Sequence, residues 1–135
     1  MRNLKSALVA LSILFVASFA GGLVADWTSG ALPGSVDLVE SALGAFAFSL
    51  ATLLSVGTVL VVVAKRTGLH SKPLQLALLG FSTGAMSMAA AVALVDGLPF
   101  YIPYDLVLVI FLGIGGAISS LYWAKHSSHD LADNA

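Results

Sequence analysis

Four long apolar segments follow one another along the chain, separated by short polar stretches. They cover residues 4–25, 37–66, 73–95 and 104–124. Each reaches the roughly 20 apolar residues that an α-helix needs to cross the hydrocarbon core of a bilayer. A barrel strand would instead show about ten residues of alternating polarity. Because lipid offers backbone groups no partners, continuous apolar runs of this length must be helices. The pattern predicts an all-α membrane protein, with four transmembrane helices in two antiparallel hairpins.

The polar stretches contain residues that start and stop helices. Gly68 and Pro73 can end the second helix and begin the third. Asp37 with Glu40 fits a capping box at the start of the second span. Residues 125–135 are polar, and we expect them to form a short, frayed cytoplasmic tail. We therefore interpret residues 1–135 as one four-helix transmembrane domain.

The first segment also resembles the start of a signal peptide. Arg2 and Lys5 precede an apolar core, and Ser18-Phe19-Ala20 could serve as a cleavage site. We interpret the segment as the first membrane-spanning helix.

The charged residues sort to the two sides of the membrane that this threading defines. All the basic residues fall on one side: Arg2, Lys5, Lys65, Arg66, Lys72 and Lys125. The charged residues in and beside the turns on the other side are all acidic: Asp26, Asp37, Glu40, Asp96 and Asp105. Because short cytoplasmic loops carry the excess of basic residues, we expect both termini in the cytoplasm and the chain in the cell membrane. We also expect Lys65, Arg66 and Lys72 to contact lipid headgroups.

Composition supports one lipid-solvated domain. Of the 135 residues, 59% are hydrophobic and 10% are charged, against roughly 25% charged residues in soluble proteins. A net charge of -1 argues against a nucleic-acid partner, which would need a basic face. The absence of Cys from the sequence excludes disulfides, thiolate metal sites and thiol nucleophiles.

Small residues recur at helical spacing in every span and predict how the helices pack. Lipid gives helices little hydrophobic drive to associate, so close backbone approach and interhelical hydrogen bonds must hold them together. The packing residues that we expect are Ser49 and Thr52 in the second span, Gly80, Gly84, Ser87 and Ala91 in the third, and Gly113, Gly116, Ala117 and Ser120 in the fourth. The first span carries Ala17, Gly21 and Ala25. We interpret these stripes as packing within the bundle. The alternative is that one of them, foremost Gly80 and Gly84, mates with another protein.

The sequence offers no candidate for catalysis, cofactor binding or metal binding. Proton relays and most transporters keep an ionisable group near mid-membrane, and the middles of the four spans contain none. Glu40 comes nearest, but its place in a first helical turn fits a cap. His70, His126 and His129 lie at the basic side, outside the spans where a membrane haem would need its ligands. We expect neither an enzyme nor a resident cofactor.

These patterns lead to a functional hypothesis by elimination. We expect a small non-catalytic accessory or structural subunit that binds other membrane subunits, or itself, within a larger assembly or a virion membrane. The alternative is a small homo-oligomeric channel or transporter, whose uncharged path is lined by hydroxyls: Ser49, Thr52, Ser55, Thr58, Thr83 and Ser87. A holin-like pore is a third possibility, suggested by size and hydrophobicity alone.

Overall fold

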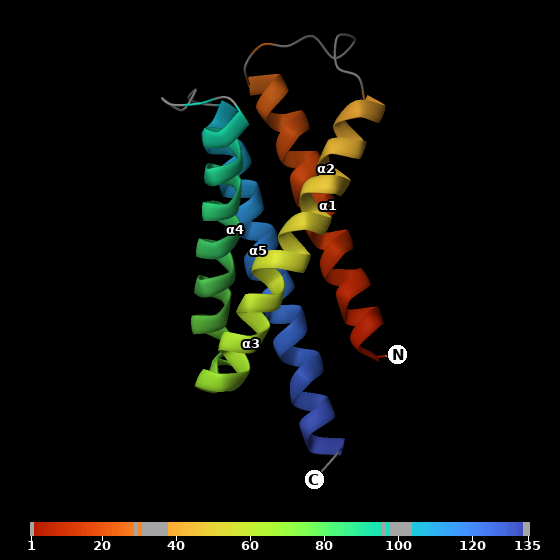
Figure 1. The fold of residues 1–135 in the computed structure, drawn as a ribbon, viewed down its shortest axis with the longest axis vertical. Coiled ribbons are helices and arrows are strands. Elements are labelled where there is room, and N and C mark those ends of the chain that lie inside the picture. Colours follow the sequence, from red (N-terminus) through yellow and green to blue (C-terminus); the bar gives the residue numbers. More distant parts are fainter. Residues whose placement is uncertain (1, 29, 31–37, 96, 98–103, 134–135) are drawn as a thin grey trace.

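Helices make up the described part of the chain (Figure 1). The computed structural model describes residues 2–28, 30, 38–95, 97 and 104–133, with side chains described at all of these except 2, 3, 70 and 127–133. The elements are α1 (Arg2–Thr28), α2 (Leu38–Thr52), the π-helix η1 (Leu53–Gly57), α3 (Thr58–Thr67), the 3-10 turn η2 (Leu69–Ser71), α4 (Pro73–Val95) and α5 (Tyr104–Asp133). Among these residues, four stretches are long and apolar enough to cross a membrane: Leu4–Thr28, Leu38–Thr67, Pro73–Val95 and Tyr104–His126. The prediction of an all-α membrane protein with four spans is confirmed.

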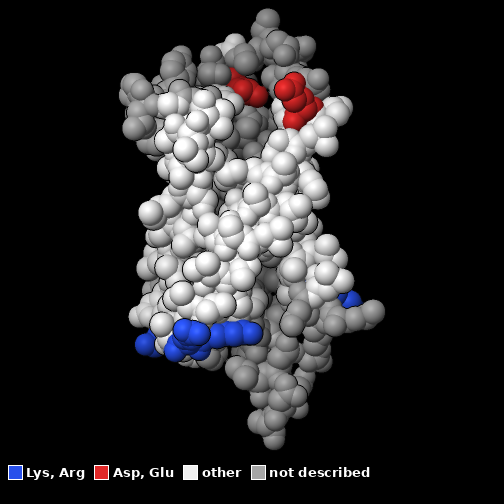
Figure 2. Space-filling view, viewed as in Figure 1, with Lys and Arg blue, Asp and Glu red and all other residues white. Residues whose placement is uncertain are grey.

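The charged side chains lie at opposite ends of the bundle. Figure 2 shows the Lys and Arg side chains gathered at one end and the Asp and Glu side chains at the other. We name the first the basic end, with Lys5, Lys65, Arg66, Lys72 and Lys125, and the second the acidic end, with Asp26, Glu40 and Asp105. Asp37 and Asp96 lie outside the described residues, as does the predicted capping box that includes Asp37. Helix α1 begins and α5 ends at the basic end (Figure 1).

Helix α5 is the centre of the bundle. It packs along α4 on one side and along α1 on the other, and these are the two most extensive helix contacts in the described part of the chain. Leu14, Met88, Val92 and Leu112 form one buried cluster that joins the three helices. Since α4 buries a residue at every fourth position from Leu76 to Val92, one continuous face of this helix is turned to the core.

The second span crosses this three-helix core diagonally (Figure 1). Near the acidic end, α2 packs on α1 and buries Ala45, Ser49 and Thr52. Near the basic end, Ala64 of α3 packs instead with Leu76 and Ala124 of the α4–α5 pair. The 30 residues of this span would reach about 45 Å as an α-helix, more than the roughly 30 Å hydrocarbon core. A tilted path accommodates that excess length.

The helix boundaries depart from the expected ones at two places, the interruption of the second span by η1 and the residues after Ala124. The second span ends, as expected, where Gly68, at φ 72°, donates its N–H to the carbonyl of Ala64. Pro73 then begins α4, as expected. The residues after Ala124, expected to be a frayed tail, are helical through Asp133. No Gly or Pro follows Ala124 to stop the helix, so leaving the membrane does not end it.

Candidate functional site

A cavity of about 420 Å³ lies beside the second span, in the basic half of the molecule. Its lining comes from segments 6–14 of α1, 52–65 of the second span, 83–84 of α4 and 116–126 of α5. The diagonal path of the second span accounts for it. Because α2 stays on α1 while α3 moves across to α4 and α5, space opens between α1 and α3. Figure 2 shows this face hollowed there.

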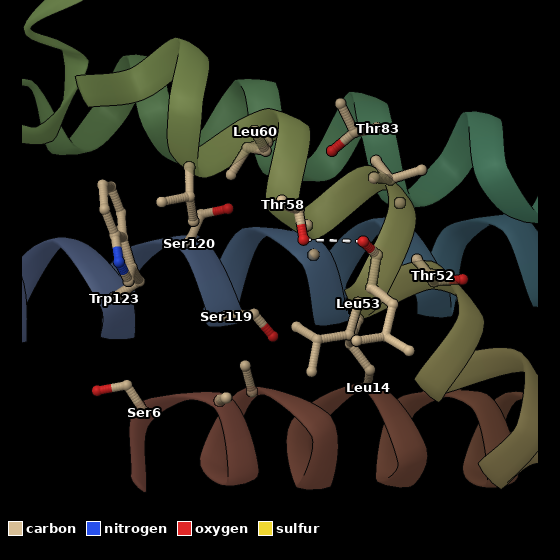
Figure 3. Close-up of a pocket in the computed structure, with 18 of the residues that line it drawn as sticks. Ser6, Leu14, Thr52, Leu53, Thr58, Leu60, Thr83, Ser119, Ser120 and Trp123 are labelled. Atoms are coloured by element: carbon tan, nitrogen blue, oxygen red, sulfur yellow. Dashed lines mark hydrogen bonds between the residues drawn. The ribbon is translucent and has the colours of Figure 1, made fainter. Parts of the chain in front are cut away.

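The cavity wall is mostly apolar but carries hydroxyls from all four spans (Figure 3). These are Ser6, Thr52, Thr58, Thr83, Ser119 and Ser120. Thr58 Oγ1 donates to the carbonyl of Leu54 at 2.8 Å, so that hydroxyl is already satisfied by its own helix. Ser119 differs, because its hydroxyl oxygen is buried and has no hydrogen-bond partner among the described residues. A buried hydroxyl without a partner costs free energy, and the hydroxyl of Ser49, which does not line the cavity, is in the same condition.

The π-helix η1 forms one wall of this cavity. Leu53, Leu54, Val56 and Gly57 of this segment all line it. The hydroxyl of Ser55, within η1, donates to the carbonyl of Ala51, in the last turn of α2, at 2.6 Å. Hydroxyls that bond back to a carbonyl one turn earlier bend membrane helices, and single π turns within α-helices occur frequently at functional sites. The π-helix η1 lies at the point where the second span turns from α1 toward α4 and α5.

Three polar or aromatic side chains mark the end of the cavity nearest the basic end. Lys65 of α3 and Trp123 and His126 of α5 line it there. The ring of His126 lies against that of Tyr122, tilted by 30° with centroids 4.1 Å apart, and its Nδ1–H donates to the Tyr122 carbonyl at 2.9 Å. This bond holds the ring and leaves Nε2 as the atom that can meet a ligand.

Gly80 and Gly84, the foremost stripe of the sequence, lie within the molecule against α5. A Cβ at Gly80 would collide with Ser120 Oγ and with the carbonyl of Gly116. A Cβ at Gly84 would collide with the carbonyl of Leu112. These glycines let the two backbones approach, so this face of α4 is covered by the chain's own helix.

The remaining predicted packing residues fall into several environments. Ser49, Thr52 and Ser120 are buried, and Gly113 lies against the ring of Phe81. Ser87, Ala91 and Ala117 are half-buried, and Ser87 donates to the carbonyl of Thr83 at 2.7 Å. Lys65, Arg66 and Lys72, expected at lipid headgroups, are exposed at the basic end.

Two functional features escaped the sequence reasoning. Gly115 of α5 faces α1, whereas Gly116 faces α4. A Cβ on Gly115 would lie 2.7 Å from Ala17 Cβ of α1. The neighbouring Gly-Gly pair was the available signal, since adjacent positions on a helix point about 100° apart. The second feature is the cavity, which arises from the tilt of one span and has no signature in spacing.

The chain was compared with protein-family models, curated proteins and solved structures, and none of them matches it. Among the described residues, no three His, Asp or Glu side chains come together as metal ligands would. The cavity presents an apolar wall, a few hydroxyls and, at its mouth, the ammonium group of Lys65.

Proposed function

We propose that the chain is a non-catalytic accessory subunit of a larger membrane assembly, held there by a partner helix that packs on α2. The observation that carries this proposal is the exposed face of α2. Gly44, Ala47 and Ala51 of α2 and Ser55 of η1 follow one another at spacings of three, four and four residues, and all are exposed; we name them the α2 stripe. A Cβ at Gly44 would meet no atom within 4 Å. Small residues at this spacing are what close helix packing in lipid requires.

The outward face of α5 differs from the α2 stripe. The outward positions of α5 are Leu106, Ile110, Ile114 and Ile118, each between 42% and 50% exposed. Large apolar side chains of this kind suit contact with lipid tails. In α4, the small residues Gly80 and Gly84 already pack against α5. The α2 stripe is thus a packing surface that the described part of the chain leaves uncovered.

The burial of the second span points in the same direction. In its most apolar 18 residues, 6% are buried, compared with 22%, 22% and 28% in the first, third and fourth spans. Membrane helices are held by packing and hydrogen bonds rather than by expulsion of water. A span with so little packing in its own chain gains most from a neighbouring subunit.

Site-specific photo-crosslinking in the native membrane tests this proposal. A photoreactive residue is placed at Ala51, in the α2 stripe, and as a matched control at Ala90, which is exposed on α4. We expect an adduct of one defined mass from Ala51 and none from Ala90. Ala47→Leu should abolish the adduct, because a bulky side chain separates the helices. Equal crosslinking from Ala51 and Ala90, or an adduct that survives Ala47→Leu, would contradict the proposal.

A small homo-oligomeric channel or transporter is the second candidate. Thr52, Thr58 and Thr83 from its expected path line the cavity, whereas Ser49 is fully buried. The cavity lining comes only from the basic half, so conduction would need the acidic half to open as well. An Ala51 adduct of twice the 13.8 kDa chain mass, together with solute flux in reconstituted vesicles, would favour this candidate. Absence of flux would remove it.

A further inference from the structure

The cavity beside the second span changes in chemistry from its mouth to its depth. Lys65 and His126 lie at the mouth, Ser119 lies deeper along α5, and Leu14 and Leu53 line the apolar interior. The seven residues from His126 back to Ser119 span about 10 Å along the helix. The order is therefore cation, then hydroxyl, then hydrocarbon, following the bundle inward from the basic end.

The mouth has one sign of charge. Lys65 contributes an ammonium group, and none of the described residues that line the cavity is an Asp or Glu. His126 lies there as well, with its Nδ1–H held by the Tyr122 carbonyl. Trp123 lies beside them, and tryptophan side chains favour the headgroup level of a bilayer. An anionic group is the complement of this mouth.

The middle of the cavity offers a hydrogen-bond donor. The Ser119 hydroxyl is buried without a partner among the described residues, and Figure 3 shows it pointing from α5 into the space toward α1. An uncharged acceptor such as an ester carbonyl would satisfy it. Beyond Ser119 the wall is mostly apolar, with the hydroxyls of Thr52 and Thr83 also in the lining, and an acyl chain suits such a wall.

The size of the cavity fits a ligand group rather than a whole folded domain. A volume of about 420 Å³ falls in the range of small-ligand pockets, roughly 300–1,000 Å³. The opening between α1 and α3 faces the surrounding membrane, so an occupant can enter from the bilayer.

We propose that this cavity binds one anionic glycerophospholipid from the leaflet at the basic end. The phosphate lies at the ammonium group of Lys65, an ester carbonyl accepts from Ser119, and an acyl chain runs along Leu14 and Leu53. Basic pockets between membrane helices bind anionic headgroups in this way. The inference does not depend on the α2 stripe, since Gly44, Ala47 and Ala51 do not line the cavity.

Quenching of Trp123 fluorescence by brominated lipid tests the proposal. The sequence has two Trp residues, and Trp27 lies at the far end of α1, so a Trp27→Phe background isolates the cavity signal. The full chain in mild detergent is titrated with brominated phosphatidylglycerol and, separately, with brominated phosphatidylcholine. We expect saturation at one phosphatidylglycerol per chain and clearly weaker quenching by the zwitterionic lipid.

Two matched variants locate the site. Lys65→Gln should weaken phosphatidylglycerol binding about fivefold, the effect of one lysine near anionic lipid, whereas Lys72→Gln should leave it unchanged. Both lysines are exposed at the basic end, but Lys65 lines the cavity and Lys72 does not. Ser119→Ala should also weaken binding. Equal quenching by the two lipids, or equal effects of the two lysine variants, would show only the general lipid shell and would overturn the proposal.

Discussion

Gly80 and Ser120 face each other across the α4–α5 contact with no space between them. Ser120 is 4% exposed, and a Cβ on Gly80 would lie 2.8 Å from Ser120 Cβ and closer still to its hydroxyl. The relation is reciprocal one turn away, where a Cβ on Gly116 would collide with the carbonyl of Gly80. In this bundle the missing side chains therefore set the distance between α4 and α5.

The first prediction concerns this contact. Gly80→Ala should destabilise the folded bundle by about 2 kcal/mol, because overpacking forces the two backbones apart. Unfolding in mixed micelles, followed by loss of helix, measures the effect. The control is Gly22→Ala, where a Cβ would meet nothing within 4 Å. If the two variants unfold at the same denaturant fraction, α4 and α5 are not held by this contact.

The second prediction concerns Leu112, which is fully buried where α1, α4 and α5 meet. Leu112→Ala should cost about 2 kcal/mol, the low end of values for core leucines. We expect the low end because a leucine side chain gains little transfer free energy when it moves from lipid into the protein core. The substitution therefore loses mainly packing contacts. The control is Leu78→Ala, since Leu78 is 61% exposed on α4. The same unfolding assay should detect almost no change there, and a large loss would mean that Leu78 is covered by a partner.

The third prediction concerns the turn at the basic end. Gly68 has φ 72°, a left-handed conformation that costs an L side chain about 1–2 kcal/mol. Gly68→Ala should lower stability by about that amount. Gly68→Asn should lose less, because Asn tolerates this conformation better. Equal losses for Ala and Asn would show that backbone conformation is not the cause.

The fourth prediction concerns the sidedness of the two ends. Because the sequence has no Cys, a single introduced thiol can be labelled without background. Ser71→Cys near the basic end and Thr28→Cys near the acidic end place exposed thiols at opposite ends. A membrane-impermeant maleimide added to intact cells should label Thr28→Cys and spare Ser71→Cys. Inverted vesicles should give the reverse, and labelling of both from one face would contradict the proposed topology.

The sequence was sufficient to predict the spans but not their arrangement. Length and hydropathy decide whether a segment crosses lipid, so the four spans were found where the structure has them. Small-residue stripes occur on every span, and spacing alone cannot say which stripe meets which. Gly80 and Gly84 meet α5, whereas Gly44 and Ala51 face outward, although both pairs consist of small residues.

The site was less accessible to sequence reasoning for a related reason. The cavity exists because α3 leaves α1, and η1 lies at that point. No Pro marks the interruption, and its local signals are Gly57 within η1 and the hydroxyls of Ser55 and Thr58, which bond back to their own helix. The helix beyond Ala124 was missed because hydropathy indicates where the membrane-spanning part of a helix ends. It does not indicate where the helix itself ends.

The central place of α5 has a consequence for how the protein is made. The ribosome delivers the N-terminal helices first, yet the helix that α1 and α4 both pack on is synthesised after both of them. Until it enters the bilayer, the glycine faces of α4 and the inner face of α1 have nothing to meet. A nascent chain that stalls before Tyr104 would leave three loosely associated helices, which is the state that membrane proteases remove.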